Sequence, residues 1–212
     1  MLHILINGLR LGDLDGVGRR LRLRYDPEAP TDPAFVPLST GLPASQPRWR
    51  GDPLRHWLQG LLPEREGVLR RWRAEFGLTD ANPESLLAHI GEDVAGAAQF
   101  VRPDRLATVL ERPSSLTPLS EADIAGLARA ARQDTLPYDP DSGLGRFSLA
   151  GAQAKFALQK TEDGWALPSG AEPSSHIFKP AIVGLEDQDV SEALSMRTAA
   201  LVGLPTARAF LA

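Results

Sequence analysis

The segment 147–156, F-S-L-A-G-A-Q-A-K-F, contains the residue types best suited to holding a phosphate group. A glycine among small residues lets the backbone approach a bulky ligand closely. Successive exposed N–H groups in such a turn form a concave anion site, and a lysine just past it can place its charge on a phosphate. The pattern predicts a phosphate-binding loop, with a β-hairpin closed by a glycine turn as the alternative. The loop residues are Ala150, Gly151, Ala152, Gln153, Ala154 and Lys155.

Lysine is scarce in this chain, which makes the position of each lysine informative. Only three of the 23 basic residues are lysines: Lys155, Lys160 and Lys179. The compact ammonium group of lysine is often used on phosphate, whereas arginine prefers two-pronged contacts. A GC-rich genome explains the arginine bias and leaves the lysines notable.

Lys179 ends a short predicted strand at 176–179, and Glu192 lies one turn into a helix predicted to begin at Asp189. A loop between strands, a strand lysine and a helix glutamate follow one another in the small lobe of a protein kinase, where the glutamate holds the lysine. The chain lacks G-x-G-x-x-G, so a sheet with a chance lysine stays open. Glu192 could also serve only as the capping-box partner of Asp189.

The elements that must position these residues are predicted from hydrophobic periodicity. Alternating apolar residues over 2–25 predict strands, with Asn7-Gly8 as a hairpin turn. The proline-rich stretch 27–53 predicts an ordered loop that Phe35, Val36, Leu38 and Leu42 anchor. Helices are predicted near 53–62, 63–77, 83–91, 120–132 and 189–202, and further strands near 96–101, 155–160, 165–167 and 176–179.

The distribution of proline and serine residues predicts that the chain has two regions. Prolines and serines over 106–119 indicate a linker between an N-terminal region, 1–105, and a second region, 120–212. After the linker, Ser120 and Asp123 form a capping-box pattern at a helix start. The expected fold class is α+β: an N-terminal β-rich subdomain with short helices, followed by a kinase-like small lobe of an antiparallel sheet plus a helix.

Composition excludes several classes of function. No apolar run approaches the ~20 residues that a membrane span needs, and the first residues lack the layout of a signal peptide. The absence of cysteine excludes disulfides and thiolate metal sites, and the net charge of −4 disfavours general nucleic-acid binding. His56 and His89 are isolated and show no metal-ligand spacing. We therefore expect a cytoplasmic protein with neither a metal site of its own nor a membrane partner.

The amino-acid sequences of the motifs are more specific than the spacing between them. The segment 147–156 is followed by W-A-L-P-S-G, H-I-F-K-P and E-A-L-S-M-R…G-L-P, and it is preceded by N-G-L-R-L-G-D-L, L-Q-G-L-L-P-E and I-G-E-D-V-A-G-A-A-Q. Together, and in this order, these motifs closely resemble the HipA-like toxin kinases of bacterial toxin–antitoxin modules. The resemblance covers nearly the whole chain.

The resemblance implies a serine/threonine protein kinase that uses ATP and Mg²⁺. It places the loop 150–155 over the nucleotide phosphates and Lys179 in contact with them. Ser148, which opens the loop motif, corresponds to the autophosphorylation site that shuts the enzyme off. From the residues alone, without the resemblance, the favoured interpretation of a hydroxyl at this position is a strand-end hydrogen bond.

The resemblance also implies partners. A small helix-turn-helix antitoxin, similar to HipB, would neutralise the toxin, and contact with DNA would be indirect, through the antitoxin. The protein substrate would be a translation factor such as an aminoacyl-tRNA synthetase, whose phosphorylation stalls translation and arrests growth.

One departure from the family pattern is large. No H-x-D…N or D-F-G-like run occurs in the 212 residues, so the catalytic Asp and the metal-binding carboxylates have no counterpart here. We therefore expect the N-terminal part of a HipA-like kinase: a fragment, a truncated product or a subunit of a split enzyme. The alternatives are a non-catalytic binding module that docks on an antitoxin or on a separate catalytic chain, and an α+β domain without a site.

The first prediction concerns activity. Phosphoryl transfer depends on positioning and on charge neutralisation by metal ions and cations. Residues 1–212 alone should show no detectable autophosphorylation with ATP and Mg²⁺, measured by radiolabel incorporation. Incorporation that the Lys179→Met substitution abolishes would contradict this expectation.

Overall fold

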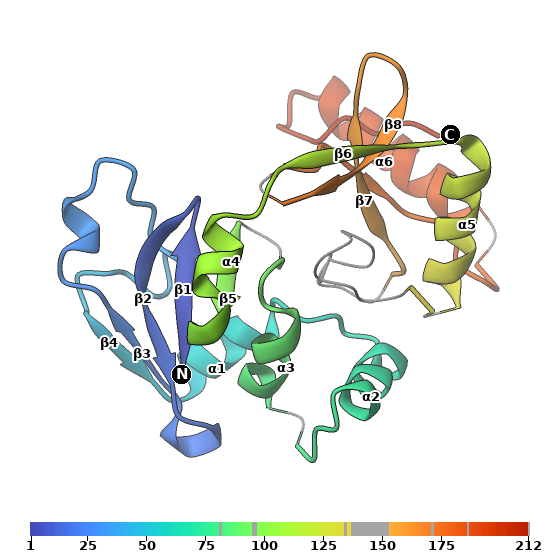
Figure 1. Cartoon of the computed structure of the whole chain (residues 1–212). Coiled ribbons are helices and arrows are strands. Elements are labelled where there is room, and N and C mark those ends of the chain that lie inside the picture. The colour runs from blue at the N-terminus through green and yellow to red at the C-terminus, as the bar shows by residue number, and fades with distance from the viewer. Residues whose placement is uncertain are drawn as a thin grey trace.

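Two antiparallel sheets organise the chain in the computed structural model, which describes residues 1–80, 82–94, 97–133, 135–136, 153–170, 172–185 and 187–211 (Figure 1). The first sheet has the order β4-β3-β2-β1-β5 and the second the order β6-β8-β7-β9. Helices accompany both sheets, so the predicted α+β class is confirmed. The strands of the first sheet are β1 (Leu2–Ile6), β2 (Leu9–Asp15), β3 (Arg22–Tyr25), β4 (Arg48–Arg50) and β5 (Ala98–Val101).

The hairpin at the start of the first sheet forms as its sequence predicts. Asn7 and Gly8 both have positive φ angles, 50° and 80°, as a type I′ turn requires, and Ile6 pairs with Leu9 directly across it. The loop after β3 is also anchored as predicted, because the Tyr25 hydroxyl donates to the buried Leu42 carbonyl at 2.6 Å. Of the predicted anchors in this loop, Val36 instead remains exposed.

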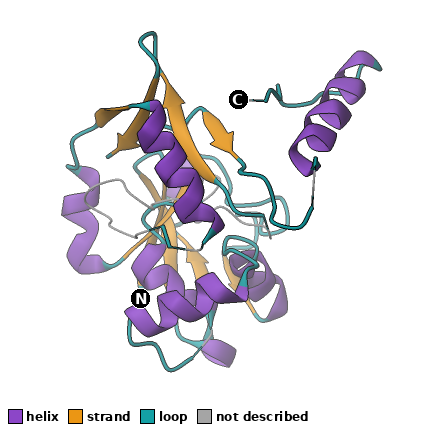
Figure 2. Cartoon of the chain, turned by 90° about the vertical axis from the view of Figure 1, so that its right-hand side faces the viewer, coloured by secondary structure: helices purple, strands orange, loops and turns teal. Residues whose placement is uncertain are grey.

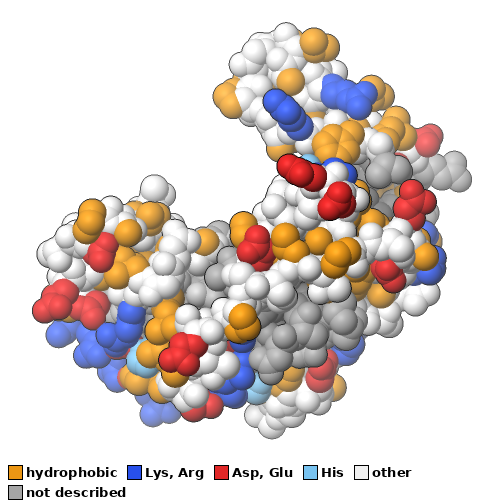
Figure 3. Space-filling model, turned by 45° about the horizontal axis from the view of Figure 1, so that its top comes forward, with side chains coloured by type: hydrophobic (Ala, Val, Ile, Leu, Met, Phe, Trp, Pro, Cys, Tyr) orange, Lys and Arg blue, Asp and Glu red, His pale blue; other side chains and the backbone are white. Residues whose placement is uncertain are grey.

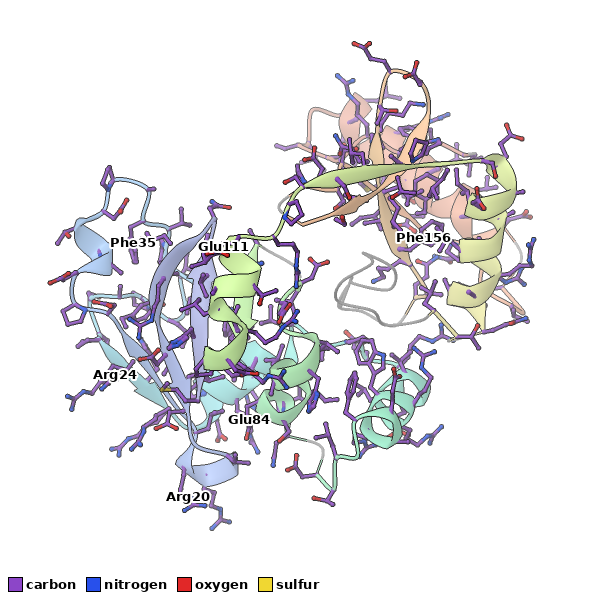
Figure 4. All side chains as sticks on the ribbon, viewed as in Figure 1. Arg20, Arg24, Phe35, Glu84, Glu111 and Phe156 are labelled. Carbon is purple, nitrogen blue, oxygen red and sulfur yellow. The ribbon has the colours of Figure 1, made fainter. Side chains whose placement is uncertain are left out.

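Three helices of the N-terminal region follow β4, and two of them bury apolar faces on the first sheet. Glu84 ties this layer to the β2–β3 turn: its buried carboxylate accepts from the Gly18 N–H at 2.6 Å (Figure 4). The helices are α1 (Asp52–Gln59), α2 (Glu66–Glu75) and α3 (Pro83–Ile90). The core that they share with the sheet includes Ile4, Leu11, Leu14, Leu23, Leu54, Leu58, Leu86, Leu87 and Phe100.

The second sheet has its own, smaller core. Ala131, Phe156, Leu158 and Leu167 are buried in it, and Leu119 and Ile124 pack against it on either side of the start of α5. The capping box of α5 is present as predicted, because Ser120 and Asp123 each accept a hydrogen bond from the other's backbone N–H. The elements of this region are β6 (Ser115–Leu119), α5 (Glu121–Arg132), β7 (Phe156–Lys160), β8 (Trp165–Ser169), β9 (His176–Phe178) and α6 (Gln188–Leu201).

The stretch expected to be a linker, 106–119, instead contains regular structure. Residues Leu106–Leu110 form helix α4, and β6 pairs with β8 over five residues. Pro118 lies within this strand although it cannot donate to a ladder. It is tolerated because β6 is the edge strand of its sheet, with one side free of ladder bonds.

A carboxylate and two arginines form an ion-pair cluster where the chain passes from the first sheet to the second. The Arg105 guanidinium donates to both oxygens of Glu92, at 2.8 and 3.0 Å, and Arg112 donates to Oε2 at 2.6 Å. The Glu92 side chain is only 10% exposed. Burial raises the pKa of Glu92, but the hydrogen bonds from Arg105 and then Arg112 outweigh it, so the pKa lies below its ordinary value of 4.5.

Helix α6 differs from the sequence prediction in its start and in its packing. Asp187, with a left-handed φ of 58°, precedes the helix, so Asp189 is a helical residue and not the cap. Ala193 is the buried residue of this helix, whereas Leu194 and Leu201 are 56% and 87% exposed. Figure 2 shows this helix, next to the C-terminus, standing apart from the other elements, and Figure 3 shows hydrophobic side chains on the surface around it.

In the part of the chain that the structure describes, no helix combines the length and apolar character that a membrane crossing requires.

A stability prediction follows from the Glu92 cluster. Glu92→Gln should lower the free energy of unfolding at neutral pH by about 3 kcal/mol, because it leaves two largely buried arginines without their shared anion. The control Asp15→Asn, which breaks the exposed pair with Arg22, should cost less than ~1 kcal/mol. Urea unfolding measures both, and equal small changes would contradict the prediction.

The same cluster should make stability depend on pH. Because the pKa of Glu92 is depressed in the folded chain, its contribution is complete above 4.5 and is lost as the pH falls through the lower folded value. The difference in free energy of unfolding between the wild type and Glu92→Gln should therefore shrink as the pH falls below 4.5. A difference that stays constant down to acid pH would contradict this assignment.

Candidate functional site

The predicted loop lies only partly within the described residues. Ser148, Ala150, Gly151 and Ala152 lie outside them, so their roles stay predictions. Gln153, Ala154 and Lys155 are described and lead directly into β7.

The two lysines predicted to contact phosphate lie at the same end of neighbouring strands. β7 and β9 are antiparallel, and Phe156 pairs with Phe178. One step further along this register, Lys155 and Lys179 face each other just beyond the ladder. Residues that are far apart in the sequence therefore bring two ammonium groups together, which is what a site for a multiply charged anion needs.

Lys179 is held by the glutamate that the sequence paired with it. Its ammonium group donates to Glu192 Oε1, and the two side chains are 36% and 33% exposed. Glu192 comes from the first part of α6, so the ion pair fixes the start of this helix beside the end of β9. The contact is present; that it serves a nucleotide remains a prediction.

Charges of both signs surround Lys155. Burial lowers the pKa of the Lys155 ammonium, the charge of Lys179 lowers it further, and Glu64 and then Glu192 act in the opposite direction. Two ammonium groups that repel each other in a partly buried place favour a bound anion, which relieves the repulsion. Glu64 had not been predicted at this site, because no local sequence pattern links it to Lys155.

Gln153 lies two residues before Lys155 in the chain and carries a hydrogen-bond donor. Its side-chain nitrogen Nε2 is buried and has no acceptor within the described part of the chain. A buried donor without a partner costs about 1–3 kcal/mol. An oxygen of a bound ligand at this place would satisfy it, which fits a phosphate-binding role.

An aromatic cluster packs next to the two lysines along β7 and β9. The rings of Phe156 and Phe178 stack with their centroids 5.2 Å apart, and the Trp165 ring meets Phe178 edge-on at 4.8 Å. Phe156 lies on β7 in the second region (Figure 4). Because each phenylalanine directly adjoins one of the two lysines, the packed rings hold the two lysine backbones in place.

The third lysine belongs to a different environment. Lys160 ends β7 at the far end from Lys155, and its ammonium lies 4.6 Å from the centroid of the Trp165 ring. This cation–π contact explains the position of Lys160 without a phosphate. Lys160 therefore serves as an internal control for the other two lysines.

The described residues contain no cluster of three His, Asp or Glu side chains that could hold a metal ion. The Mg²⁺ expected from the resemblance thus has no ligand set among them.

Two family models match the chain. The model described as the HipA N-terminal domain matches residues 2–101, and the model described as the HipA-like C-terminal domain matches residues 147–212. The chain belongs to the HipA family. The second match contains the loop, β7 to β9 and α6, so every residue of the candidate site except Glu64 falls within it.

Relatives of the HipA family are similar over most of this chain. Y4mE of Sinorhizobium fredii (strain NBRC 101917 / NGR234), which is named as a candidate kinase, is 36% identical over 185 residues, 83% of this chain and 42% of the relative. HipA in a solved toxin–antitoxin complex of Shewanella oneidensis MR-1 with HipB and operator DNA matches with a TM-score of 0.68 and 24% identity. That match covers 96% of this chain and 45% of the other, so the chain spans less than half the length of these relatives. The structural similarity shows the shared fold.

Proposed function

We propose that this chain supplies the nucleotide-binding small lobe of a HipA-family serine/threonine protein kinase. One observation carries the proposal: Lys155 and Lys179 meet at the paired ends of β7 and β9, and Glu192 holds Lys179. ATP is the ligand we propose, with its phosphates on the two lysines and the loop 150–155. The buried Nε2 of Gln153 would donate to one of its oxygens.

The residues of the chain would contribute binding and orientation. Glu192 restrains the Lys179 ammonium and so reduces the entropy lost when it contacts a phosphate. Lys155 adds a second positive charge, which attracts the triphosphate and neutralises part of its charge. Mg²⁺ would screen the phosphates during transfer, and its ligands are not among the described residues.

The partners follow from the family and stand as proposals. A HipB-like helix-turn-helix antitoxin is the proposed inhibitor; the Shewanella oneidensis HipA of similar fold was solved with HipB and operator DNA. The proposed protein substrate is a translation factor such as an aminoacyl-tRNA synthetase. We place the activity in the cytoplasm.

A second candidate function is docking without catalysis, on an antitoxin or on a separate catalytic chain. The exposed apolar side chains of α6 and the segment after it favour this candidate, because apolar patches of this kind mark contact surfaces. They include Leu194, Leu201, Val202, Leu204 and Phe210. ATP binding by the chain distinguishes the two candidates, since docking alone needs none.

The lysines provide the test of nucleotide binding. Lys155→Ala and Lys179→Ala should each weaken ATP binding, by up to roughly 1.5–3 kcal/mol for a charge-assisted contact. Lys160→Ala should leave binding unchanged, because its ammonium lies over Trp165. Calorimetric titration of the three variants measures this, and an equal loss in all three would indicate a diffuse charge effect and no site.

Ser148 provides a test of regulation. A phosphate on Ser148 would add about −1.5 to −2 charges and strong acceptor oxygens. These would compete for the loop N–H groups and for the lysines, and they would repel an incoming triphosphate. Ser148→Asp should therefore lower the ATP affinity, whereas Ser148→Ala should leave it nearly intact. Unchanged affinity in the Asp variant would remove Ser148 from the mechanism.

A further inference from the structure

The first sheet carries an array of arginines on the face that points away from its core. Along β3 and β4, exposed arginines alternate with side chains that pack into the core. The register sets Arg22 directly opposite Arg50 and Arg24 directly opposite Arg48. Residues that pair in this way lie on the same face, with Cβ atoms about 4.5–5.5 Å apart. We call these four residues the arginine block.

Aspartates on β2 neutralise only the half of the arginine block that lies on β3. Arg22 pairs with Asp15 at 2.8 Å, and Arg24 pairs with Asp13 at 3.2 Å. Asp13 also binds Arg10 at 2.8 Å, so its charge is shared. The two arginines of the edge strand β4 have no ion-pair partner among the described residues.

The arginine block costs the sheet stability unless an anion lies on it. Like charges directly opposite each other destabilise a β-sheet. The block contains two such pairs, separated along the strands by two residues, or about 6.6–6.8 Å. Because the planar guanidinium fork matches the oxygens of phosphate and carboxylate groups, an external anion with several charges would relieve the repulsion.

Charge is unevenly distributed along the chain. The first 50 residues contain seven arginines and five acidic residues, although the net charge of the whole chain is −4. Arg19 and Arg20 are exposed on the turn that leads into β3, so they extend the positive region beyond the arginine block. Figure 4 shows Arg20 and Arg24 pointing outward, and Figure 3 shows basic side chains gathered at the lower left of the surface. Clustering of this kind is typical of surfaces that bind polyanions.

The surroundings of the arginine block favour a nucleic-acid duplex among the possible polyanions. Sites for small ligands are concave, and protein interfaces have an apolar centre, whereas this face is exposed and carries only arginines on β3 and β4. A single strand would need aromatic rings on which its bases stack. Trp49, the aromatic residue of β4, instead packs against the core, and its Nε1 donates to the Pro43 carbonyl at 3.3 Å. A duplex offers closely spaced phosphates that need no stacking.

We propose that the arginine block binds the phosphodiester backbone of a nucleic-acid duplex, independently of base sequence. The unpaired arginines of β4 make the main phosphate contacts, and the aspartates of β2 orient the arginines of β3. This surface lies on the first sheet, whereas Lys155 and Lys179 adjoin strands of the second. The inference therefore goes beyond the proposed function.

The decisive variant is the double substitution Arg48→Gln/Arg50→Gln in the 212-residue chain. Fluorescence anisotropy measures its binding to a labelled DNA duplex of roughly 20 base pairs, two helical turns. Each phosphate contact contributes about −0.9 to the slope of log affinity against log salt concentration, so four contacts predict a slope of about −3.6. The double variant should reduce this slope by about 1.8 and weaken binding at least ~10-fold at low salt.

Two further variants control for charge and for folding. Arg55→Gln/Arg70→Gln removes the same charge from exposed ion pairs on α1 and α2 and should leave the slope unchanged. Asp15→Asn frees Arg22 from its exposed partner and should tighten binding by up to about fivefold.

Thermal unfolding and size-exclusion chromatography separate the inference from structural roles of the same arginines. Arg48→Gln/Arg50→Gln should not lower the thermal midpoint, because it removes like-charge pairs. If the arginines only guard the edge strand, the double variant self-associates and its duplex affinity is unchanged, which overturns the inference.

The remaining outcomes decide the ligand. Binding of the DNA duplex, of an RNA duplex of equal length, or of both supports the inference, and the tighter one identifies the nucleic acid. Polyglutamate binding as tightly as either duplex, no duplex binding by the wild type, or equal losses in the two double variants overturns it. If Arg48→Gln/Arg50→Gln does not fold, Asp15→Asn and the wild-type salt slope provide the test. ATP takes no part in these measurements, so this inference and the proposed function can fail separately.

Discussion

The antiparallel register between β7 and β9 is the constraint on which the candidate site depends. Pairing Phe156 with Phe178 sets Lys155 opposite Lys179, and a shift of one residue would turn one lysine to the other face of the sheet. The register is held by packing as well as by the ladder, because the two phenylalanine rings stack and Trp165 closes on them from the next strand. Apolar packing thus holds the two lysines close to each other although their positive charges repel.

Two carboxylates, Glu192 and Glu64, offset the repulsion between the lysines. The ion pair of Glu192 accounts for the position of the start of α6. Glu192 neutralises Lys179 from the first part of the helix, although the rest of α6 packs little on the sheet. Glu64 moderates the environment of Lys155 from the N-terminal region. The two carboxylates act on different lysines: Glu192 accepts a hydrogen bond from Lys179 and orients it, whereas the charge of Glu64 favours the protonated form of Lys155.

Local signals in the sequence predicted local structure well. Asn7-Gly8 forms its hairpin turn, and Ser120 with Asp123 forms its capping box, because each depends on residues a few positions apart. The strand β6 was missed because its proline and polar residues are compatible with a strand only at a sheet edge, which is a property of the assembled sheet. The lysines could be singled out by composition, but the hydrogen bond from Arg71 to Leu136 joins distant segments and leaves no periodic trace in the sequence.

The N-terminal region holds the β6–α5 segment at both ends, which has a mechanical consequence. Glu92 binds Arg112 just before β6, and Arg71 binds Leu136 just after α5. One attachment would leave this segment free to rotate about a single point, whereas two separated attachments restrict that rotation. Since β6 pairs with β8 and α5 packs on the core behind Phe156, the restriction passes to the strands that carry the lysines. The N-terminal region therefore acts as a frame for the second sheet.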